Sequence, residues 1–154
     1  MQRVDGTRIL NGMKRAGVVC IVVLAFFGLA DSIYLAQNEI SNTPLICTVQ
    51  NLSDCNIVAT SQYSRIFGIP LAEFGVAFFS IVFILSALEL FLFNRILRRI
   101  LQMISLVGVV ASLYFSFIEI FVIHALCIYC LASAGITLFI LISASVIEPV
   151  RKNV

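Results

Sequence analysis

Residues 125–147 read ALCIYCLASAGITLFILISASVI, an apolar run without a charged residue that opens on a C-x-x-C pair, Cys127 and Cys130. A run of this length can cross a bilayer, whose hydrocarbon core takes about 20 helical residues. In a helix, the i, i+3 spacing puts both sulfurs on one face. The positive N-terminus of a helix also favours the thiolate form of a cysteine. The stretch therefore predicts a membrane-spanning helix with a reactive thiol pair at its head.

Further apolar runs precede this one, at about residues 16–36, 70–93 and 100–123. Of the 154 residues, 61% are apolar and 12% are charged, whereas soluble domains have about 45–50% and about 25%. Because backbone polar groups in lipid must be satisfied within each segment, every run is expected to be a helix. We predict an all-α integral membrane protein, a four-transmembrane-helix bundle that forms a single domain over residues 1–154.

The basic residues orient this bundle. Nine of the ten Lys and Arg residues precede the first run, separate the second from the third, or follow the fourth; only Arg65 lies in the loop 37–69. The positive-inside rule places both termini in the cytoplasm and the loop 37–69 outside. We expect the short connection near His124, and with it the C-x-x-C pair, on the same extracytoplasmic side. The net charge of +2 is too small to indicate nucleic-acid binding.

The loop 37–69 carries a second cysteine pair, Cys47 and Cys55. Ser53-Asp54 is suited to cap a short helix that begins at Cys55 and runs toward Arg65. If the loop and the head of the last run share one membrane face, four thiols converge there. This arrangement indicates thiol–disulfide chemistry that moves electron pairs. The fifth cysteine, Cys20, lies within the first run and is expected to be a small packing residue.

Two other interpretations of the cysteines remain open. Four cysteines can hold a structural zinc ion, although the C-x7-C spacing is long for a zinc knuckle and an oxidising compartment disfavours free thiols. The cysteines can also form disulfides that only staple the loop to the fourth helix of a non-enzymatic membrane bundle. A staple needs stable disulfides, whereas a relay needs thiols that exchange partners.

The motifs together resemble the vitamin K epoxide reductase family, in the form of a stand-alone bacterial or archaeal member. The resemblance covers about residues 28–135. It is carried by Gly28-Leu29-Ala30-Asp31-Ser32-Ile33-Tyr34-Leu35, Cys47-x7-Cys55, Ser61, Phe67-Gly68-Ile69-Pro70 and His124-Ala125-Leu126-Cys127-Ile128-Tyr129-Cys130. The DsbB-type quinone oxidases fit less well, because their C-x-x-C pair lies in the first outer loop.

The resemblance implies a role for each outer cysteine. Cys130 would be the sulfur nearest a quinone and Cys127 its disulfide partner. Cys55 would attack Cys127 to form an interloop disulfide. Cys47 would be the shuttle thiol that exchanges with a redox partner, here expected to be a separate thioredoxin-fold, DsbA-like protein.

The implied activity is oxidation of that partner and reduction of a membrane quinone of the ubiquinone, menaquinone or vitamin K type. Such an enzyme supports disulfide bond formation from the inner or plasma membrane of a bacterium or archaeon. The family alternative is a vitamin K epoxide or quinone reductase.

The quinone site is expected to be a flat apolar pocket that holds Ser61, Phe67, Phe74 and Tyr129, with Phe78 and Phe115 as further candidates. Two positions depart from the animal enzymes, which carry an asparagine where Leu71 stands and a tyrosine where Ala134 stands. Both departures favour quinone reduction over epoxide reduction. Because Leu71 has no polar group, Ser61 or a backbone N–H near the loop helix is the expected donor to the quinone carbonyl.

Three titratable residues have two interpretations each. Glu119 lies about one turn inside the outer end of the third run, where an acid indicates function unless it simply reaches water at the interface. Asp31 poses the same question in the first run. His124 lies at the membrane edge, where its cationic form can stabilise a nearby thiolate or have no role.

Overall fold

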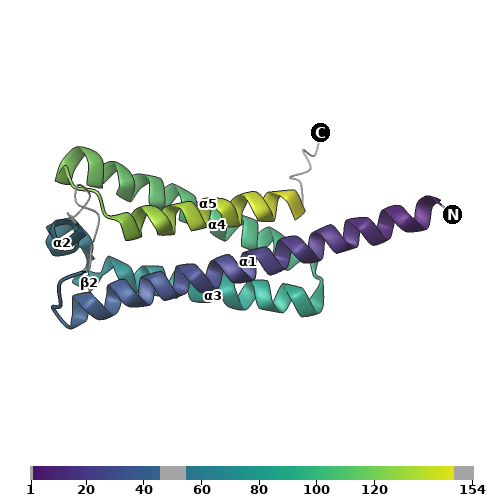
Figure 1. Ribbon diagram of the computed structural model, residues 1–154, viewed down its shortest axis with the longest axis horizontal. Coiled ribbons are helices and arrows are strands. Elements are labelled where there is room, and N and C mark those ends of the chain that lie inside the picture. The colour runs from purple at the N-terminus through teal and green to yellow at the C-terminus, as the bar shows by residue number, and fades with distance from the viewer. Residues whose placement is uncertain (1, 46–54, 148–154) are drawn as a thin grey trace.

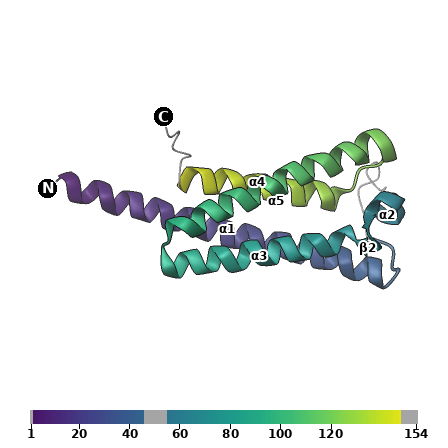
Figure 2. The same cartoon turned by 180° about the vertical axis from the view of Figure 1, so that it is seen from behind.

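The apolar runs form the long helices seen in Figures 1 and 2, in a computed structural model that describes residues 2–45 and 55–147. These helices are α1 (Gln2–Ile40), α3 (Leu71–Leu92), α4 (Arg95–Ile118) and α5 (Ile128–Ile147). Within these described residues, four helical segments are long and apolar enough to cross a membrane. The predicted all-α bundle with four spans is thereby confirmed.

The helix boundaries differ from the predicted ones at two places. The apolar part of α1 is Gly12–Ile40, and the rest of the helix extends toward the N-terminus beyond the other helices (Figure 1). The fourth helix was expected from about Ala125, but α5 begins at Ile128. The reason is a turn at His124, whose left-handed conformation (φ 54°) separates α5 from the helix before it.

The connection between α3 and α4 is a tight turn built on a buried carboxylate. Phe93 takes the left-handed conformation and its N–H donates to the Glu89 carbonyl at 3.0 Å. Asn94 caps α4 by accepting from the Ile96 N–H at 3.1 Å. The Glu89 carboxylate, which is fully buried, accepts from the Arg98 side chain at 2.5 Å and from the Asn94 N–H at 3.1 Å. The pair therefore closes this end of the bundle.

At its other end, α4 continues into a π-helical turn, η2 (Glu119–Ile123). Such wide turns accommodate one extra residue and are frequent at functional sites. The turn closes where the Ala125 N–H donates to the Glu119 carbonyl at 3.1 Å. Residues 124–127 then lead into α5.

The segment between α1 and α3 lies at the same end of the bundle as residues 124–127 (Figures 1 and 2). It contains α2 (Cys55–Thr60), a 3-10 turn η1 (Gln62–Ser64), and the strands β1 (Arg65–Ile66) and β2 (Ile69–Pro70). The strands pair antiparallel, with Ile66 opposite Ile69. Phe67 and Gly68 join them with positive φ angles of 54° and 83°, as two-residue hairpins prefer. Cys47, Ser53 and Asp54 lie outside the described residues.

The core is formed where α1 packs against α3 and α5, and α4 against α5. At Gly28, an added Cβ would collide with the Phe79 ring, so this glycine lets α1 and α3 approach closely. Large apolar side chains on the outer faces are exposed, for example Phe91 and Val146, as expected of helices surrounded by lipid. The buried core residues are Val18, Ile21, Ala25, Phe79, Val82, Leu101, Ile140, Ala144 and Ile147.

A second buried cluster lies at the end of the bundle that carries α2. It contains Leu45, Cys55, Val58, Ala125 and Cys127. The cluster packs the loop helix α2 onto the residues that lead into α5. In this way it brings the cysteine of the loop and the head of the C-x-x-C pair into one apolar environment.

Candidate functional site

The C-x-x-C pair lies at the N-terminus of α5, with one cysteine just outside the helix. The Leu131 N–H donates to the Cys127 carbonyl at 3.0 Å, which is the first hydrogen bond of the helix. Cys127 therefore occupies the N-cap position and Cys130 the third helical position. At an N-cap, a side-chain acceptor receives hydrogen bonds from the free N–H groups of the first turn. The Cys127 sulfur takes this part by accepting from the backbone N–H groups of Tyr129 and Cys130.

The two sulfurs interact directly with each other. Cys127 and Cys130 are free thiols; Cys127 is buried and Cys130 half-buried. A hydrogen bond from the Cys130 thiol, supported by the backbone N–H groups, lowers the pKa of the Cys127 thiol against the opposing effect of burial. A lowered pKa raises the fraction of nucleophilic thiolate. Cys127 is therefore the better prepared nucleophile of the pair.

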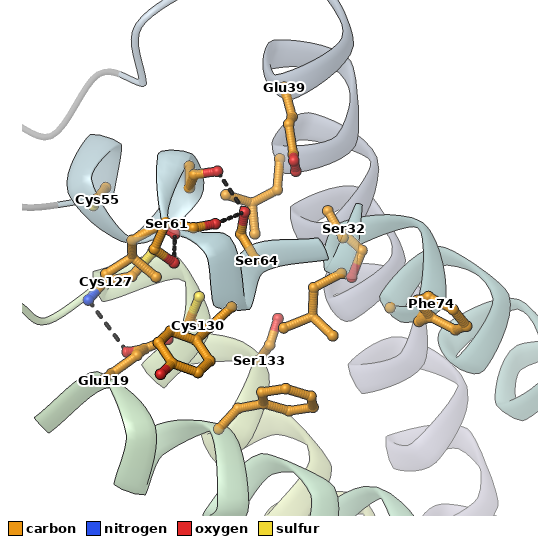
Figure 3. Close-up of a pocket in the computed structure, with 18 of the residues that line it drawn as sticks. Ser32, Glu39, Cys55, Ser61, Ser64, Phe74, Glu119, Cys127, Cys130 and Ser133 are labelled. Carbon is orange, nitrogen blue, oxygen red and sulfur yellow. Dashed lines mark hydrogen bonds between the residues drawn. The ribbon is translucent and has the colours of Figure 1, made fainter. Parts of the chain in front are cut away.

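Glu119 contacts both members of the pair, as Figure 3 shows for its hydrogen bond to the Cys127 backbone. Its side chain is buried, with 4% exposed. The Glu119 carboxyl group accepts from the Cys127 N–H at 3.4 Å and also hydrogen-bonds with the Cys130 thiol. The π-helical turn makes this possible, because it turns the carboxyl group back over the connection to α5. The Glu119 side chain therefore does not simply reach water at the membrane interface, which was one of its two interpretations.

Cys55 approaches the pair from the loop side. It is the first residue of α2, is fully buried and is disulfide-bonded. It belongs to the same buried cluster as Cys127, and Figure 3 shows both among the residues that line one pocket. The structure thus brings together Cys55, Cys127 and Cys130, whereas Cys47 lies outside the described residues.

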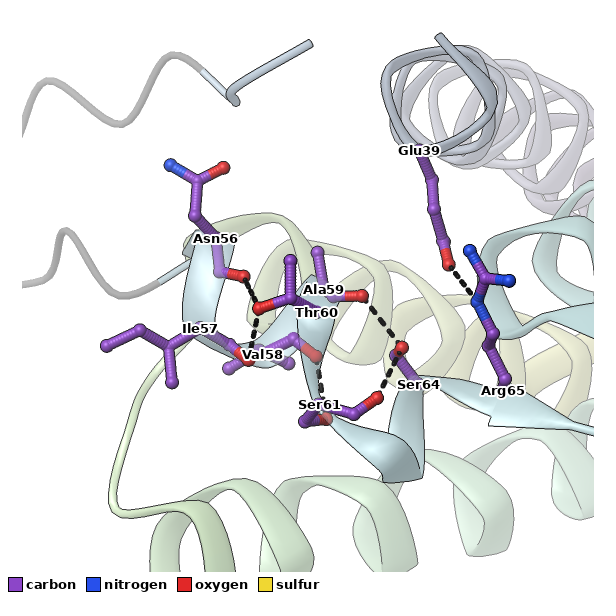
Figure 4. Close-up of polar contacts among 9 residues, drawn as sticks. All are labelled: Glu39, Asn56, Ile57, Val58, Ala59, Thr60, Ser61, Ser64 and Arg65. Carbon is purple, nitrogen blue, oxygen red and sulfur yellow. Dashed lines mark hydrogen bonds and ion pairs between the residues drawn. The ribbon is translucent and has the colours of Figure 1, made fainter. Parts of the chain in front are cut away.

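Side-chain hydrogen bonds to backbone carbonyls close the C-terminal end of the loop helix (Figure 4). The Ser64 hydroxyl donates to the Ala59 carbonyl at 2.7 Å, and the Ser61 hydroxyl donates to the Val58 carbonyl at 2.8 Å. Farther along, the Arg65 side chain pairs with Glu39 of α1 at 3.5 Å. The two serine contacts stabilise the turn from α2 into η1, and the Arg65–Glu39 pair ties the start of β1 to the end of α1.

A cavity of about 1030 Å³ opens beside the three cysteines. Cys55, Glu119, Cys127 and Cys130 line one part of it. The apolar part of its wall includes Leu71, Phe74, Phe78, Phe79, Ala111 and Phe115. Residues that carry hydroxyl groups also line it, among them Ser32, Ser112, Ser116, Ser133 and Thr137. A mostly apolar pocket with a few polar groups is typical of a site for a small organic molecule.

The residues predicted for the quinone site are only partly assembled at this cavity. Ser61 and Phe74 line it, and so do Phe78 and Phe115. Phe67 does not: it is 99% exposed, because the turn between β1 and β2 directs it away from the bundle. Tyr129 is not among the lining residues, and its ring packs on Tyr34 at 5.4 Å between centroids.

The remaining sequence candidates have distinct positions. Leu71 lines the cavity, so no polar group faces it from that position. Ala134 is half-buried on α5. Asp31 accepts from the Ser133 hydroxyl at 2.5 Å, which links α1 to α5 beside the cavity. His124 forms the turn before the C-x-x-C pair. Within residues 2–45 and 55–147, no three metal-ligating side chains gather in a way that could hold a metal ion.

The contact between Glu119 and the two cysteines is the feature that sequence reasoning missed. The available signal was an acid inside the third span, shortly before a C-x-x-C pair in the chain. Helical periodicity alone does not bring residue 119 against residues 127 and 130. The wide turn η2 and the left-handed His124 make the approach, and neither has a clear sequence signature.

The four apolar helices and the cysteine site together define an integral membrane protein with a buried thiol pair at one end of its bundle. The chain matches the Vitamin K epoxide reductase family over residues 19–145 and belongs to this family. Members of this family are oxidoreductases, and this chain is therefore a membrane oxidoreductase. A comparison with curated proteins finds no match.

Proposed function

We propose that this protein oxidises a separate thioredoxin-fold partner and passes the electron pair to a membrane quinone, which supports disulfide bond formation outside the cytoplasm. The observation that carries the proposal is the cavity at which Cys55, Cys127 and Cys130 meet. One side of it offers a thiol–disulfide pathway from the loop. The other side offers an apolar space between the helices.

The chain's own residues suit the thiol steps. Cys55 would attack the Cys127 sulfur of an oxidised C-x-x-C pair, because the two share one buried cluster. Cys130 would leave and so become the thiol next to the cavity. An attack of the Cys47 thiolate on the Cys55 sulfur would then release Cys127 as a thiolate, and the lowered pKa of Cys127 keeps it ready to close the disulfide with Cys130 when the pair gives up its two electrons. Cys47 would exchange with the partner at the start of the relay.

The cavity fits a quinone by size and by chemistry. A volume of about 1030 Å³ is at the upper end of small-molecule sites, which span about 300–1,000 Å³. Phe74, Phe78 and Phe115 provide flat apolar walls. A bound quinone would supply the two-electron acceptor. Cys130 lies in the cavity wall, where its sulfur can approach a ring, and Ser112 and Ser116 of α4 are the candidate donors to the quinone's carbonyl oxygens.

The orientation follows from the charges at the two ends of the bundle. The cysteine end carries Arg65. The opposite end carries the α3–α4 turn with Arg95, Arg98 and Arg99, and Lys14 and Arg15 in α1; the Arg15 guanidinium lies 5.0 Å from the centre of the Phe93 ring. By the positive-inside rule, the second end faces the cytoplasm and the cysteines face outward.

Epoxide reduction is less well supported by the same cavity. The animal enzymes use an asparagine at the position of Leu71, and Leu71 lines the cavity here without a hydrogen-bonding group. A purely structural staple leaves both the cavity beside the thiols and the contact of Glu119 with the two sulfurs unexplained. These observations favour quinone-linked thiol oxidation.

The experiment is a quinone-reduction assay with protein reconstituted in lipid vesicles. Electron donors are a reduced thioredoxin-fold protein or a small dithiol. We expect Cys130→Ala to abolish quinone reduction with either donor, because it removes the last thiol of the relay. We expect Cys47→Ala to block the protein donor while small-dithiol activity is partly retained.

The matched control is Cys20→Ser, which removes an exposed cysteine of α1 that lies away from the site. It should leave both activities unchanged. Equal and complete loss with both donors in Cys47→Ala and Cys130→Ala would contradict an ordered relay. Full activity in Cys130→Ala would contradict the assignment of the cavity.

A further inference from the structure

The relay needs a proton at Cys130, and one carboxyl group is placed to supply it. Glu119 is 4% exposed, accepts from the Cys127 N–H at 3.4 Å and hydrogen-bonds with the Cys130 thiol. It also lines the cavity together with both cysteines. A carboxyl group in contact with a reacting sulfur can exchange a proton with it directly.

The chemistry of the site explains why such a group is required. When the Cys127–Cys130 disulfide opens, the Cys130 sulfur leaves with the electron pair of the S–S bond. A thiolate released beside an apolar wall lacks the water that would otherwise stabilise its charge. A proton delivered at that moment neutralises it. The reverse step requires that the same proton be removed again.

We propose that Glu119 is the proton donor and acceptor for Cys130, a proposal that rests on the thiol relay described under Proposed function. In the forward step, the Cys55 thiolate attacks the Cys127 sulfur, a Cys55–Cys127 bond forms, and the Cys127–Cys130 bond breaks. Glu119 gives its proton to the Cys130 sulfur and becomes a carboxylate. In the reverse step the carboxylate takes the proton from Cys130, whose sulfur attacks Cys127 and releases Cys55 as a thiolate.

Another carboxyl group near this part of α5 provides the natural comparison. Asp31 lies within the bundle and accepts from the Ser133 hydroxyl at 2.5 Å. Its hydrogen-bond donor is therefore a hydroxyl group. Asp31→Asn therefore removes an acid of the same region without touching the sulfur contact, which makes it a matched control for Glu119→Gln.

The test isolates the opening of the C-x-x-C disulfide from the quinone and from the protein partner. In full-length protein with Cys20, Cys47 and Cys55 changed to Ser, the Cys127–Cys130 disulfide is formed and then reduced with dithiothreitol, whose thiolate takes the place of Cys55. Samples are quenched with acid and alkylated, and release of Cys130 is followed by mass spectrometry. We expect Glu119→Gln to slow release by about a hundredfold, at the low end of general acid–base effects.

Two further readouts separate proton transfer from simple positioning. Glutamine keeps the size of the side chain and an acceptor for the Cys127 N–H, and Glu119→Asp keeps the acid. We expect Glu119→Asp to recover most of the rate. We also expect a formate buffer, whose formic acid fraction can donate the missing proton, to accelerate Glu119→Gln and not the parent protein. Asp31→Asn should release Cys130 at the parent rate.

A parent-like rate in Glu119→Gln would overturn the proposal. A slow Glu119→Gln that formate does not rescue, together with a lower unfolding temperature, would also overturn it and assign Glu119 a positioning role. Because this assay contains no quinone and no partner, its failure is distinct from that of the proposed function, which the vesicle assay tests.

Discussion

At the residue scale, the two cysteines of the C-x-x-C pair have different surroundings although they are neighbours on one turn of helix. Cys127 lies at the N-cap and accepts hydrogen bonds, which favours its thiolate. Cys130 lies inside the helix, contacts Glu119 and faces the cavity. This asymmetry is consistent with the proposed relay, in which Cys127 exchanges disulfides with the loop and Cys130 faces the electron acceptor.

The first prediction concerns the acidity of Cys127. Its pKa is lowered chiefly by the hydrogen bond from the Cys130 thiol, so Cys130→Ala should raise that pKa toward the ordinary value of about 8.5. At neutral pH the thiolate fraction of Cys127 should then fall. The measurement is the alkylation rate of Cys127 against pH, followed by mass spectrometry and normalised to its own plateau. If the pH at which the alkylation rate is half-maximal stays in place or moves down in Cys130→Ala, the hydrogen bond from Cys130 is not what lowers the pKa of Cys127.

The second prediction concerns Ser61, the expected donor to a quinone carbonyl. The Ser61 hydroxyl donates to the Val58 carbonyl at 2.8 Å, so its proton is already engaged. Ser61→Ala should therefore raise the KM for a soluble quinone by less than about threefold, below the roughly tenfold limit for one neutral hydrogen bond. Steady-state kinetics in the vesicle assay measure it. A tenfold rise would mean that the hydroxyl leaves Val58 for the quinone.

Residue-scale features were predictable where local spacing decides them. The i, i+3 spacing correctly put Cys127 and Cys130 together at the head of α5. The exposure of Phe67 was not predictable from its aromatic character, because the direction of its side chain depends on the backbone of a two-residue turn. The contact of Glu119 with the sulfurs depends on the shape of a whole connection, which no single residue type encodes.

At the scale of elements, the α3–α4 turn is held by a charged pair inside the bundle. Glu89 is fully buried and the Arg98 side chain is 11% exposed. Removing one member of a buried pair leaves the other charge uncompensated, which costs about 3–5 kcal/mol. Replacing both members by apolar residues leaves no uncompensated charge inside the bundle.

The third prediction follows from this pair. Arg98→Met should lower the thermal unfolding temperature in detergent strongly, and the double variant Glu89→Leu with Arg98→Met should be more stable than Arg98→Met alone. Thermal unfolding followed by circular dichroism, which does not depend on thiol labelling, measures the unfolding temperature of both variants. If the double variant were the less stable, the main role of Glu89 would be its hydrogen bond to the Asn94 N–H and not its pairing with Arg98.

The positions of the helices were predictable because apolar runs of span length leave few alternatives in lipid. Helix ends were less predictable. The sequence gives no sign that the third span ends in a π-helical turn, since the residues of Glu119–Ile123 are as apolar as an ordinary helix apart from the acid. The start of α5 was placed too early for the same reason, because Ala125 and Leu126 are compatible with a helix.

At the scale of the whole molecule, the loop between α1 and α3 and the connection from α4 to α5 share one end of the bundle (Figure 1). The basic α3–α4 turn lies at the other end. This polarity permits a direct test of the orientation that we propose from the positive-inside rule.

The fourth prediction is that test. In a background without native cysteines, Ser41→Cys should be labelled from outside by a membrane-impermeant thiol reagent on intact cells. Ile96→Cys should be labelled only after the membrane is opened. Both positions are exposed, and neither change removes a basic residue. Labelling of Ile96→Cys on intact cells would reverse the orientation.

The π-helical turn η2 has a consequence for how this sequence can vary in length. Each residue advances a helix by about 100° around its axis. Deleting one residue within Glu119–Ile123 would therefore convert the π-helical turn into regular α-helix. The following residues, including Cys127 and Cys130, would then rotate about the helix axis relative to Glu119. Substitutions at Phe121 or Val122, whose side chains are exposed, leave that register untouched. Between the third span and the C-x-x-C pair, we therefore expect natural variants to exchange residues freely but to keep their number.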